Sequence, residues 1–132
     1  MSNEAVPVEG PYEIHDFTVS DAVAIPQYTL MQLTDPRTAS ASSANSQVWA
    51  GIIMREKEAN SGQTEMGLCT NGGIFVLTAG SDGIGIGELV SLSGTNVIKT
   101  ATEAEVVTGD VIGKALEAIA ANTTGEVKIG AI

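Results

Sequence analysis

The segment GDVIGKALE, residues 109–117, is the part of the chain that comes nearest to a nucleotide-binding motif. A phosphate-binding loop has the form GxxxxGK followed by Ser or Thr, because backbone N–H groups surround the phosphates while the hydroxyl binds Mg²⁺. Here three residues separate Gly109 from Gly113, and Ala115 stands at the hydroxyl position. Asp110 would also place a negative charge beside the phosphates. We therefore expect no nucleotide site in this segment and no cofactor.

A second glycine-rich run, SDGIGIGELVSLSG, places Gly83, Gly85 and Gly87 at alternate positions. A dinucleotide-binding loop requires GxGxxG between a strand and a helix. Here only one residue, instead of two, separates the second glycine from the third. The run also continues into ELVSLSG, which has strand character. We interpret it as a turn or β-bulge.

Cys69 and His15 are the single cysteine and the single histidine of the chain. A nucleophilic cysteine needs a base within hydrogen-bond reach, and a zinc site needs more ligands than these two residues supply. No motif surrounds either residue, so we interpret Cys69 as part of a half-buried strand. No nucleophile, base and orienting group occur together, and the chain is not expected to be an enzyme.

The balance of charge excludes one class of partner. Sixteen acidic and six basic residues give a formal net charge of −10. Affinity for nucleic acid depends mainly on Lys and Arg that neutralise phosphates, so no direct binding of DNA or RNA is expected. No apolar run approaches the ~20 residues of a membrane span, and the N-terminus lacks the basic flank and apolar run of a secretory signal. We expect a soluble protein with no membrane association.

Residues 1–20 are expected to form an extended N-terminal arm. Pro7, Gly10 and Pro11 lie among acidic residues, which disfavours a self-packed segment. Apolar residues nevertheless recur along it, as in a segment that adds to the sheet of a partner. An ordinary flexible terminus is the alternative. The candidate partner-binding residues are Val6, Val8, Tyr12, Ile14 and Phe17.

Residues 21–132 are expected to form one β-rich domain. The chain has only one Trp, two Tyr and two Phe but 15 glycines, a composition that suits short strands and tight turns. Together with a strand over 14–20, seven segments have strand character: 27–34, 48–55, 64–70, 73–79, 88–94, 95–99 and 126–132. Closely spaced strands of this kind indicate an all-β barrel or sandwich, with at most one or two short helices and no evident internal repeat.

The segments between these strands carry further expectations. Thr102 and Glu105 have the spacing of a capping box that begins a helical turn. Residues 34–47 read as a long loop, and residues 56–62, EKEANSG, as an exposed connection in which Lys57 is solvated. Asn71-Gly72-Gly73 is expected to be a tight turn between two strands. Residues 109–119 remain ambiguous between helix and strand, because apolar residues at helical spacing compete with two glycines.

Four phrases occur in an order that resembles the capsid-cement, or head-decoration, proteins of tailed double-stranded DNA viruses. They are TDPRTASASSANSQVWAGIIMREKEANSG, GGIFVLTAG, IGIGELVSLSGTN and GDVIGKALEAIAANTTGEVKIG. The resemblance extends from about residue 21 to the end and rests on short apolar and glycine-led phrases, none of which is a catalytic signature.

The resemblance implies a compact β-rich fold and a place on the outer surface of the virion capsid. Such proteins assemble as homotrimers where subunits of the major capsid protein meet, and they stabilise the head. The resemblance implies no cofactor and no catalytic residue, and it gives the N-terminal arm a role in contacting the capsid. It also favours a short strand within residues 109–117, with Lys114 facing solvent or a neighbour and Leu116 in the core.

Two other functions compete with this interpretation. The first is a tail, fibre or surface-adhesion module of a virion that binds a host receptor. The second is a small enzyme or carrier domain that uses Cys69 or Lys114. The number of copies per particle distinguishes the first rival from a cement, and substitution of these two residues tests the second.

Overall fold

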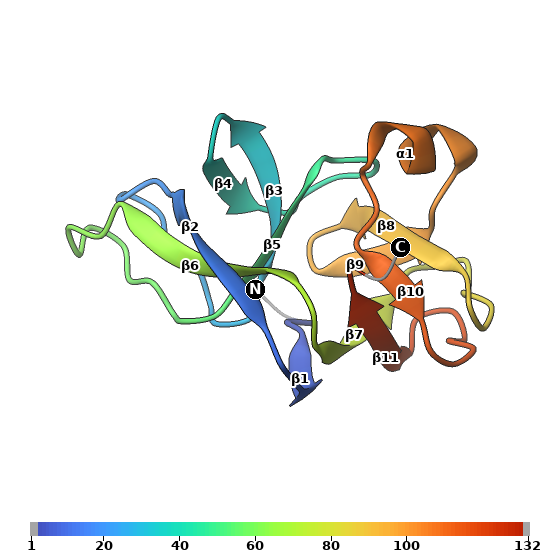
Figure 1. Ribbon diagram of the computed structural model, residues 1–132. Helices are drawn as coiled ribbons and strands as arrows, with labels where there is room; N and C mark the ends of the chain where they lie inside the picture. Colours follow the sequence, from blue (N-terminus) through green and yellow to red (C-terminus); the bar gives the residue numbers. More distant parts are fainter. Residues whose placement is uncertain (1–2, 131–132) are drawn as a thin grey trace.

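A computed structural model describes residues 3–130 and confirms the all-β class. The strands form two lobes that lie side by side (Figure 1), and one short helix accompanies them in the described part of the chain. The elements are β1 (Val6–Glu9), β2 (Glu13–Thr18), β3 (Leu30–Asp35), β4 (Thr38–Ala41), β5 (Trp49–Ile53), β6 (Glu65–Asn71), β7 (Ile74–Ala79), β8 (Leu89–Gly94), β9 (Val97–Thr100), α1 (Glu103–Thr108), β10 (Gly113–Ala115) and β11 (Thr124–Ile129).

Strands β2 to β6 form a closed barrel in the order β2-β4-β3-β5-β6, which we call the N-terminal barrel. Neighbouring strands are antiparallel except β2 and β4, which pair in parallel at Thr18 and Thr38. The cluster of buried side chains within this barrel consists of Val19, Ile25, Met31, Ala39, Ala50, Ile53, Met66 and Leu68.

Strands β7 to β11 form a second barrel, the C-terminal barrel. They belong to a sheet with the order β1-β7-β11-β10-β8-β9, and a further parallel pairing of β7 with β9 closes five of these strands on themselves. Strand β1 is the sixth member and pairs antiparallel with the first half of β7. The N-terminal strand of the chain thus extends the sheet of the C-terminal barrel.

The two barrels have the same topology, so the chain contains a structural repeat. Each pairing in one barrel has a counterpart of the same direction in the other when β2 to β6 are matched with β7 to β11. An isolated bridge, Ile25 to Lys57 in one barrel and Ile84 to Ile119 in the other, completes the match. No repeat was evident in the sequence, and the repeat lies in the backbone topology.

The repeat extends to individual residues. Equivalent core positions are Val19 and Ala79, Ile25 and Ile84, Met31 and Val90, Ala39 and Ile98, Ile53 and Ala115, and Leu68 and Val127. Gly51 and Gly113 are also equivalent, and a Cβ atom at either would lie within 2.7 Å of a carbonyl oxygen of the adjacent strand. Glycine is required at both positions because two strands approach each other closely there.

A second hydrophobic cluster, distinct from the one inside the N-terminal barrel, joins the two barrels. Leu30, Ile52 and Cys69 of the N-terminal barrel are fully buried in the same cluster as the interior of the C-terminal barrel. Asn96, in the turn between β8 and β9, is also fully buried at this contact. Its Oδ1 accepts a hydrogen bond from the Leu30 N–H (2.8 Å), and its own N–H donates to the Ser42 hydroxyl (3.0 Å). Apolar burial and paired polar groups together join the barrels.

Several expectations about connections need correction. The long loop expected over 34–47 contains β4, because Pro36 and Arg37 make a tight turn that returns the chain along β3. Gly72 and Gly73, both at φ +80°, turn the chain as expected, but the strands on either side belong to different barrels. Residues 131–132, expected to end the last strand, lie outside the described residues.

Residues 3–20 of the expected arm contribute two strands. β1 and β2 follow one another along the continuous partner formed by β6 and β7. The structure therefore does not confirm an extended arm in this part of the chain, and residues 1–2 lie outside the described range. Proline at position 7 fits because β1 is the edge strand of its sheet.

Lys57 is fully buried, in contrast to the solvated position expected for it. Its Nζ donates hydrogen bonds to the carbonyl oxygens of Asp21 (2.9 Å), Val23 (3.0 Å) and Glu58 (3.0 Å). The Asp21 carboxylate lies 3.9 Å from Nζ. These contacts satisfy all three ammonium donors and tie together the loops at one end of the N-terminal barrel. The equivalent residue of the C-terminal barrel is Ile119, an ordinary core side chain.

The substitution Lys57→Met should lower the free energy of unfolding by at least about 2 kcal/mol, because the side chain keeps its length but loses its charged donors. The matched control is Ile119→Met, a volume-conserving change at the equivalent position, which should cost less than about 1.5 kcal/mol. Urea unfolding measures both. Equal stabilities of the two variants would show that the ammonium contacts do not stabilise the barrel.

Candidate functional site

Cys69 and His15, the residues considered for catalysis, lie close together on the paired strands β6 and β2, but they differ in exposure. Cys69 is fully buried on β6, and its Sγ contacts the carbonyl oxygens of Asn71 and Gly72, both at 3.5 Å. Burial raises the pKa of the Cys69 thiol. His15 is exposed on β2, and its Nε2 lies 2.9 Å from Oε1 of Glu13. This contact lowers the pKa of Glu13 below its ordinary value. A buried thiol with a raised pKa has little of the thiolate character that a nucleophile needs.

The segment GDVIGKALE contains a strand, β10, as the resemblance implied. Gly113 is buried against β11, and Lys114 is exposed, as expected. Leu116 was expected in the core, but 39% of its surface is exposed. The error has a simple cause: β10 ends at Ala115, and this residue takes the inward position.

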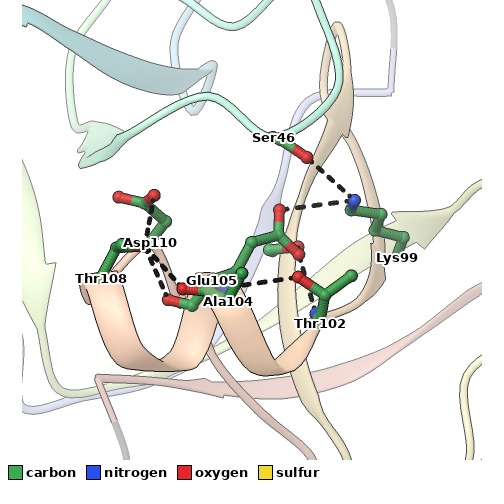
Figure 2. A network of polar contacts seen from close by, with 8 residues as sticks. Ser46, Lys99, Thr102, Ala104, Glu105, Thr108 and Asp110 are labelled. Carbon is green, nitrogen blue, oxygen red and sulfur yellow. Dashed lines mark hydrogen bonds and ion pairs between the residues drawn. The ribbon is translucent and has the colours of Figure 1, made fainter.

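A polar network joins the helix to both barrels (Figure 2). The Glu105 side chain accepts hydrogen bonds from the Thr102 N–H (2.8 Å) and from the Ser91 hydroxyl (3.0 Å). Lys99 Nζ lies 3.4 Å from the other carboxylate oxygen of Glu105 and donates to the Ser46 hydroxyl (3.1 Å). Ser46 belongs to the N-terminal barrel, while the other residues belong to the C-terminal one. The network therefore fixes α1 and the contact between barrels.

The helix at this network was predicted from its capping box, and that prediction is confirmed. Thr102 is the N-cap, and its hydroxyl accepts from the Glu105 N–H while the Glu105 carboxylate accepts from the Thr102 N–H. What the spacing did not reveal is that Glu105 is buried. Burial alone would raise the pKa of Glu105, but hydrogen bonds from Thr102, Ser46 and Ser91 together lower it below its ordinary value.

A polar cleft of about 440 Å³ opens beside this network. Its walls include Asn45, Ser81, Asp82, Ser93, Lys99 and Thr102. Lys99 is engaged by Glu105 and Ser46, so the cleft presents mainly hydroxyl and amide groups together with the carboxylate of Asp82. No group of three or more His, Cys, Asp or Glu residues that could hold a metal ion occurs within residues 3–130. No helix among the described residues is long and apolar enough to span a membrane.

The five candidate partner-binding residues lie along the ribbon formed by β1 and β2. Val6, Val8 and Ile14 are exposed. Tyr12 packs against Phe75 with ring centroids 5.3 Å apart, and Phe17 packs against the core of the N-terminal barrel. Three apolar side chains thus remain available for a partner on this ribbon, and two contribute to the fold.

The described geometry defines the class of fold as a tandem of two like five-stranded barrels joined by a hydrophobic cluster to which both contribute. No model of a known protein family matches the chain, and no curated protein matches it.

Sequence reasoning missed three residues on which the structure depends. Asn96 lies in SGTN, a turn sequence between two strands, but nothing in it indicates docking against another barrel. Lys57 lies among charged residues and looks like a surface residue. Ser46 is one of several serines in its loop, and no local pattern distinguishes it from the others. In each case at least one partner lies more than 30 residues away in the chain, beyond the reach of local patterns.

The substitution Glu105→Gln should reduce stability near neutral pH by about 1 kcal/mol, because the amide retains the cap but not the charge that faces Lys99. The folded-state pKa of Glu105 is lowered, so its contribution is present above the ordinary value of 4.5 and is lost as the pH falls below it. The difference between the wild type and Glu105→Gln should therefore shrink in acid.

Urea unfolding at about pH 7 and about pH 3 measures this difference. Glu103→Gln, an exposed change in the same helical turn, is the control and should have little effect at either pH. A difference that is unchanged in acid would mean that the Glu105 charge does not stabilise the fold.

Proposed function

We propose that this chain is a non-enzymatic structural protein of a tailed virus that binds the outer surface of the capsid. It cements neighbouring subunits of the major capsid protein, assembled as a homotrimer. The observation that carries the proposal is the exposure of Val6, Val8 and Ile14 along one ribbon of an acidic protein. The ordered phrases that resemble head-decoration proteins supply the choice of partner.

The positions of these phrases are consistent with that choice. They cover the turn from β3 into β4, the whole of β5, β7 and β8, and the segment from β10 to β11. They therefore supply strands to both barrels and the glycines at which strands approach closely. A resemblance in such residues speaks for a common fold more than for a common binding site, so the contact with the capsid is assigned to the ribbon.

Two physical features support a cementing role. A homotrimer presents the same ribbon three times, and linked weak contacts give a much stronger overall attachment than one contact alone. The net charge of −10 keeps the protein soluble at high copy number and opposes association of crowded particles. The hydrophobic cluster and the buried polar links that join the barrels hold them together as one body.

Expanded shells of the parent virus, prepared with and without the protein, test the proposal. Shells that carry the protein should resist heating and low magnesium better, and the protein should be present in many copies per shell. Equal robustness of the two preparations would refute the cementing role. A few copies confined to the tail would instead identify a tail or adhesion module.

A pair of variants tests the assignment to the ribbon in the same assay. Val6→Ser combined with Val8→Ser should weaken binding to shells, because each change removes exposed apolar surface that a partner would cover. Val107→Ser is the control, since Val107 is the most exposed valine but lies on α1. Equal loss of binding in both would point away from the ribbon.

A further inference from the structure

The structural repeat makes β2 the counterpart of β7, and the two strands differ in what covers one edge. Strand β11 pairs along one edge of β7, while β9 and β1 share the other, β9 at Thr78 and Ala79 and β1 at residues 74–76. Strand β6 pairs along one edge of β2, and β4 reaches the other edge only at Thr18. Within residues 3–130 no strand pairs on that edge of β2 before Thr18.

The parallel pairing sets the register between the two strands. Thr18 and Thr78 each pair with the first residue of their parallel neighbour. Residues 14–16 of β2 therefore correspond to residues 74–76 of β7, the part that β1 covers. In the C-terminal barrel Val6 pairs with Val76, Pro7 with Phe75 and Glu9 with Ile74. The N-terminal barrel has no counterpart of β1.

The missing strand is visible in the burial of β2. Phe75 is fully buried under Tyr12 and Tyr28, with ring centroids 5.3 and 6.5 Å away. The equivalent residue, His15, has 52% of its side chain exposed. Ile14 is 49% exposed, and only Phe17 of β2 is partly buried. Most side chains of β2 are therefore exposed, because among the described residues the N-terminal barrel has no segment that covers β2 as the N-terminal segment with β1 and Tyr12 covers β7.

The open edge of β2 ends where Arg37 contacts the backbone of Asp16 and Thr18. The Thr18 N–H donates to the Arg37 carbonyl (2.7 Å), and the Arg37 guanidinium donates to the Asp16 carbonyl. Because backbone groups alternate in direction along a strand, Ile14 directs its N–H and C=O to the same side as Asp16 and Thr18. Arg37 thus covers the end of the edge, and the N–H and C=O of Ile14 remain for an added strand.

The charges around this edge select the kind of partner. Glu13, Asp16 and Glu65 lie on or opposite β2, and Arg37 is the one cation in contact with the edge among the described residues. A second copy of this chain would bring β1, VPVE, together with its own net charge of −10. Like charges at such a contact oppose association, whereas Lys or Arg would favour it.

We propose that the open edge of β2, opposite residues 14–16, accepts an extended segment of another protein in which Lys or Arg alternates with apolar residues. The segment adds as an antiparallel strand, as β1 does on β7, and one of its apolar side chains covers Ile14. The assignment of this segment to the major capsid protein rests on the proposed function. The existence of the edge site does not.

Two variants and one control test the edge. Glu13→Lys with Asp16→Lys reverses its charge, and Ile14→Pro removes the N–H that an added strand would bond while leaving the bonds to β6. Glu56→Lys with Glu58→Lys changes the net charge equally at two exposed residues away from β2. Thermal unfolding first establishes that each variant is folded, and if Ile14→Pro is not, the charge reversal carries the test.

The first probe is a synthetic peptide of alternating valine and lysine, followed by amide NMR, with a valine and glutamate peptide as its control. The lysine peptide should shift the amide signals of residues 14–16 and protect the Ile14 amide from exchange, and both edge variants should weaken its binding about tenfold or more. Shifts elsewhere, equal binding of the glutamate peptide, or equal binding by the edge variants would overturn the proposal. A dimer formed by exchange of β1, seen by sedimentation, would overturn the choice of a basic partner.

The second probe is the expanded shell of the parent virus. If wild-type protein binds shells and the edge variants bind less, the edge is the site that the capsid uses. If wild-type protein and both edge variants bind equally, the assignment of the edge to the capsid is wrong while the proposed function stands. If wild-type protein does not bind shells but the lysine peptide binds β2, the proposed function fails and the edge site remains.

Discussion

An apolar patch on the N-terminal barrel is buried against the C-terminal barrel, and this burial is the constraint on which the rest of the fold depends. Leu30, Ile52 and Cys69 would face solvent if the barrel stood alone, yet each is fully buried in the cluster that fills its neighbour. A five-stranded barrel of about sixty residues buries too little surface to be robust by itself. Sharing a hydrophobic cluster allows two such barrels to be stable together, and Asn96 and the Glu105 network supply polar bonds at fixed positions across the contact.

Equivalent positions in the two barrels solve the same packing problem with different chemistry. At one end of each barrel a side chain must fill the space beneath two loops. In the C-terminal barrel this side chain is Ile119, and in the N-terminal barrel it is Lys57 with three carbonyl acceptors. The buried Lys57 ammonium needs an acceptor for each of its N–H donors, so it restricts the positions of the surrounding loops more than the apolar side chain of Ile119 does. The repeat is therefore one of backbone topology, with few residue types in common.

Local patterns predicted much of the secondary structure and little of its assembly. Alternation in EVKI, the apolar run VWAGII and the spacing of Thr102 and Glu105 correspond to β11, β5 and the cap of α1. Each depends on neighbours within one turn or one strand, which is the range that sequence patterns describe. The burial of Lys57, the docking of Asn96 and the repeat itself depend on contacts between residues more than 30 positions apart. The exposed strand β2 looked like part of an arm because its open edge leaves most of its residues facing solvent.

The position of β1 determines what would remain folded if the chain were cleaved between the two barrels. The strand lies at the start of the chain but pairs with β7 in the sheet of the C-terminal barrel. The next strand, β2, pairs with β6 of the N-terminal barrel. A cut between the barrels at Gly72 and Gly73 would therefore not release two whole modules. The C-terminal fragment would lose the strand that shields Phe75, and the N-terminal fragment would carry a strand with nothing to pair with. The protein consists of two barrels of like topology, but because β1 adds to the sheet of the C-terminal barrel, neither half of the chain contains a complete copy of what it needs to fold alone.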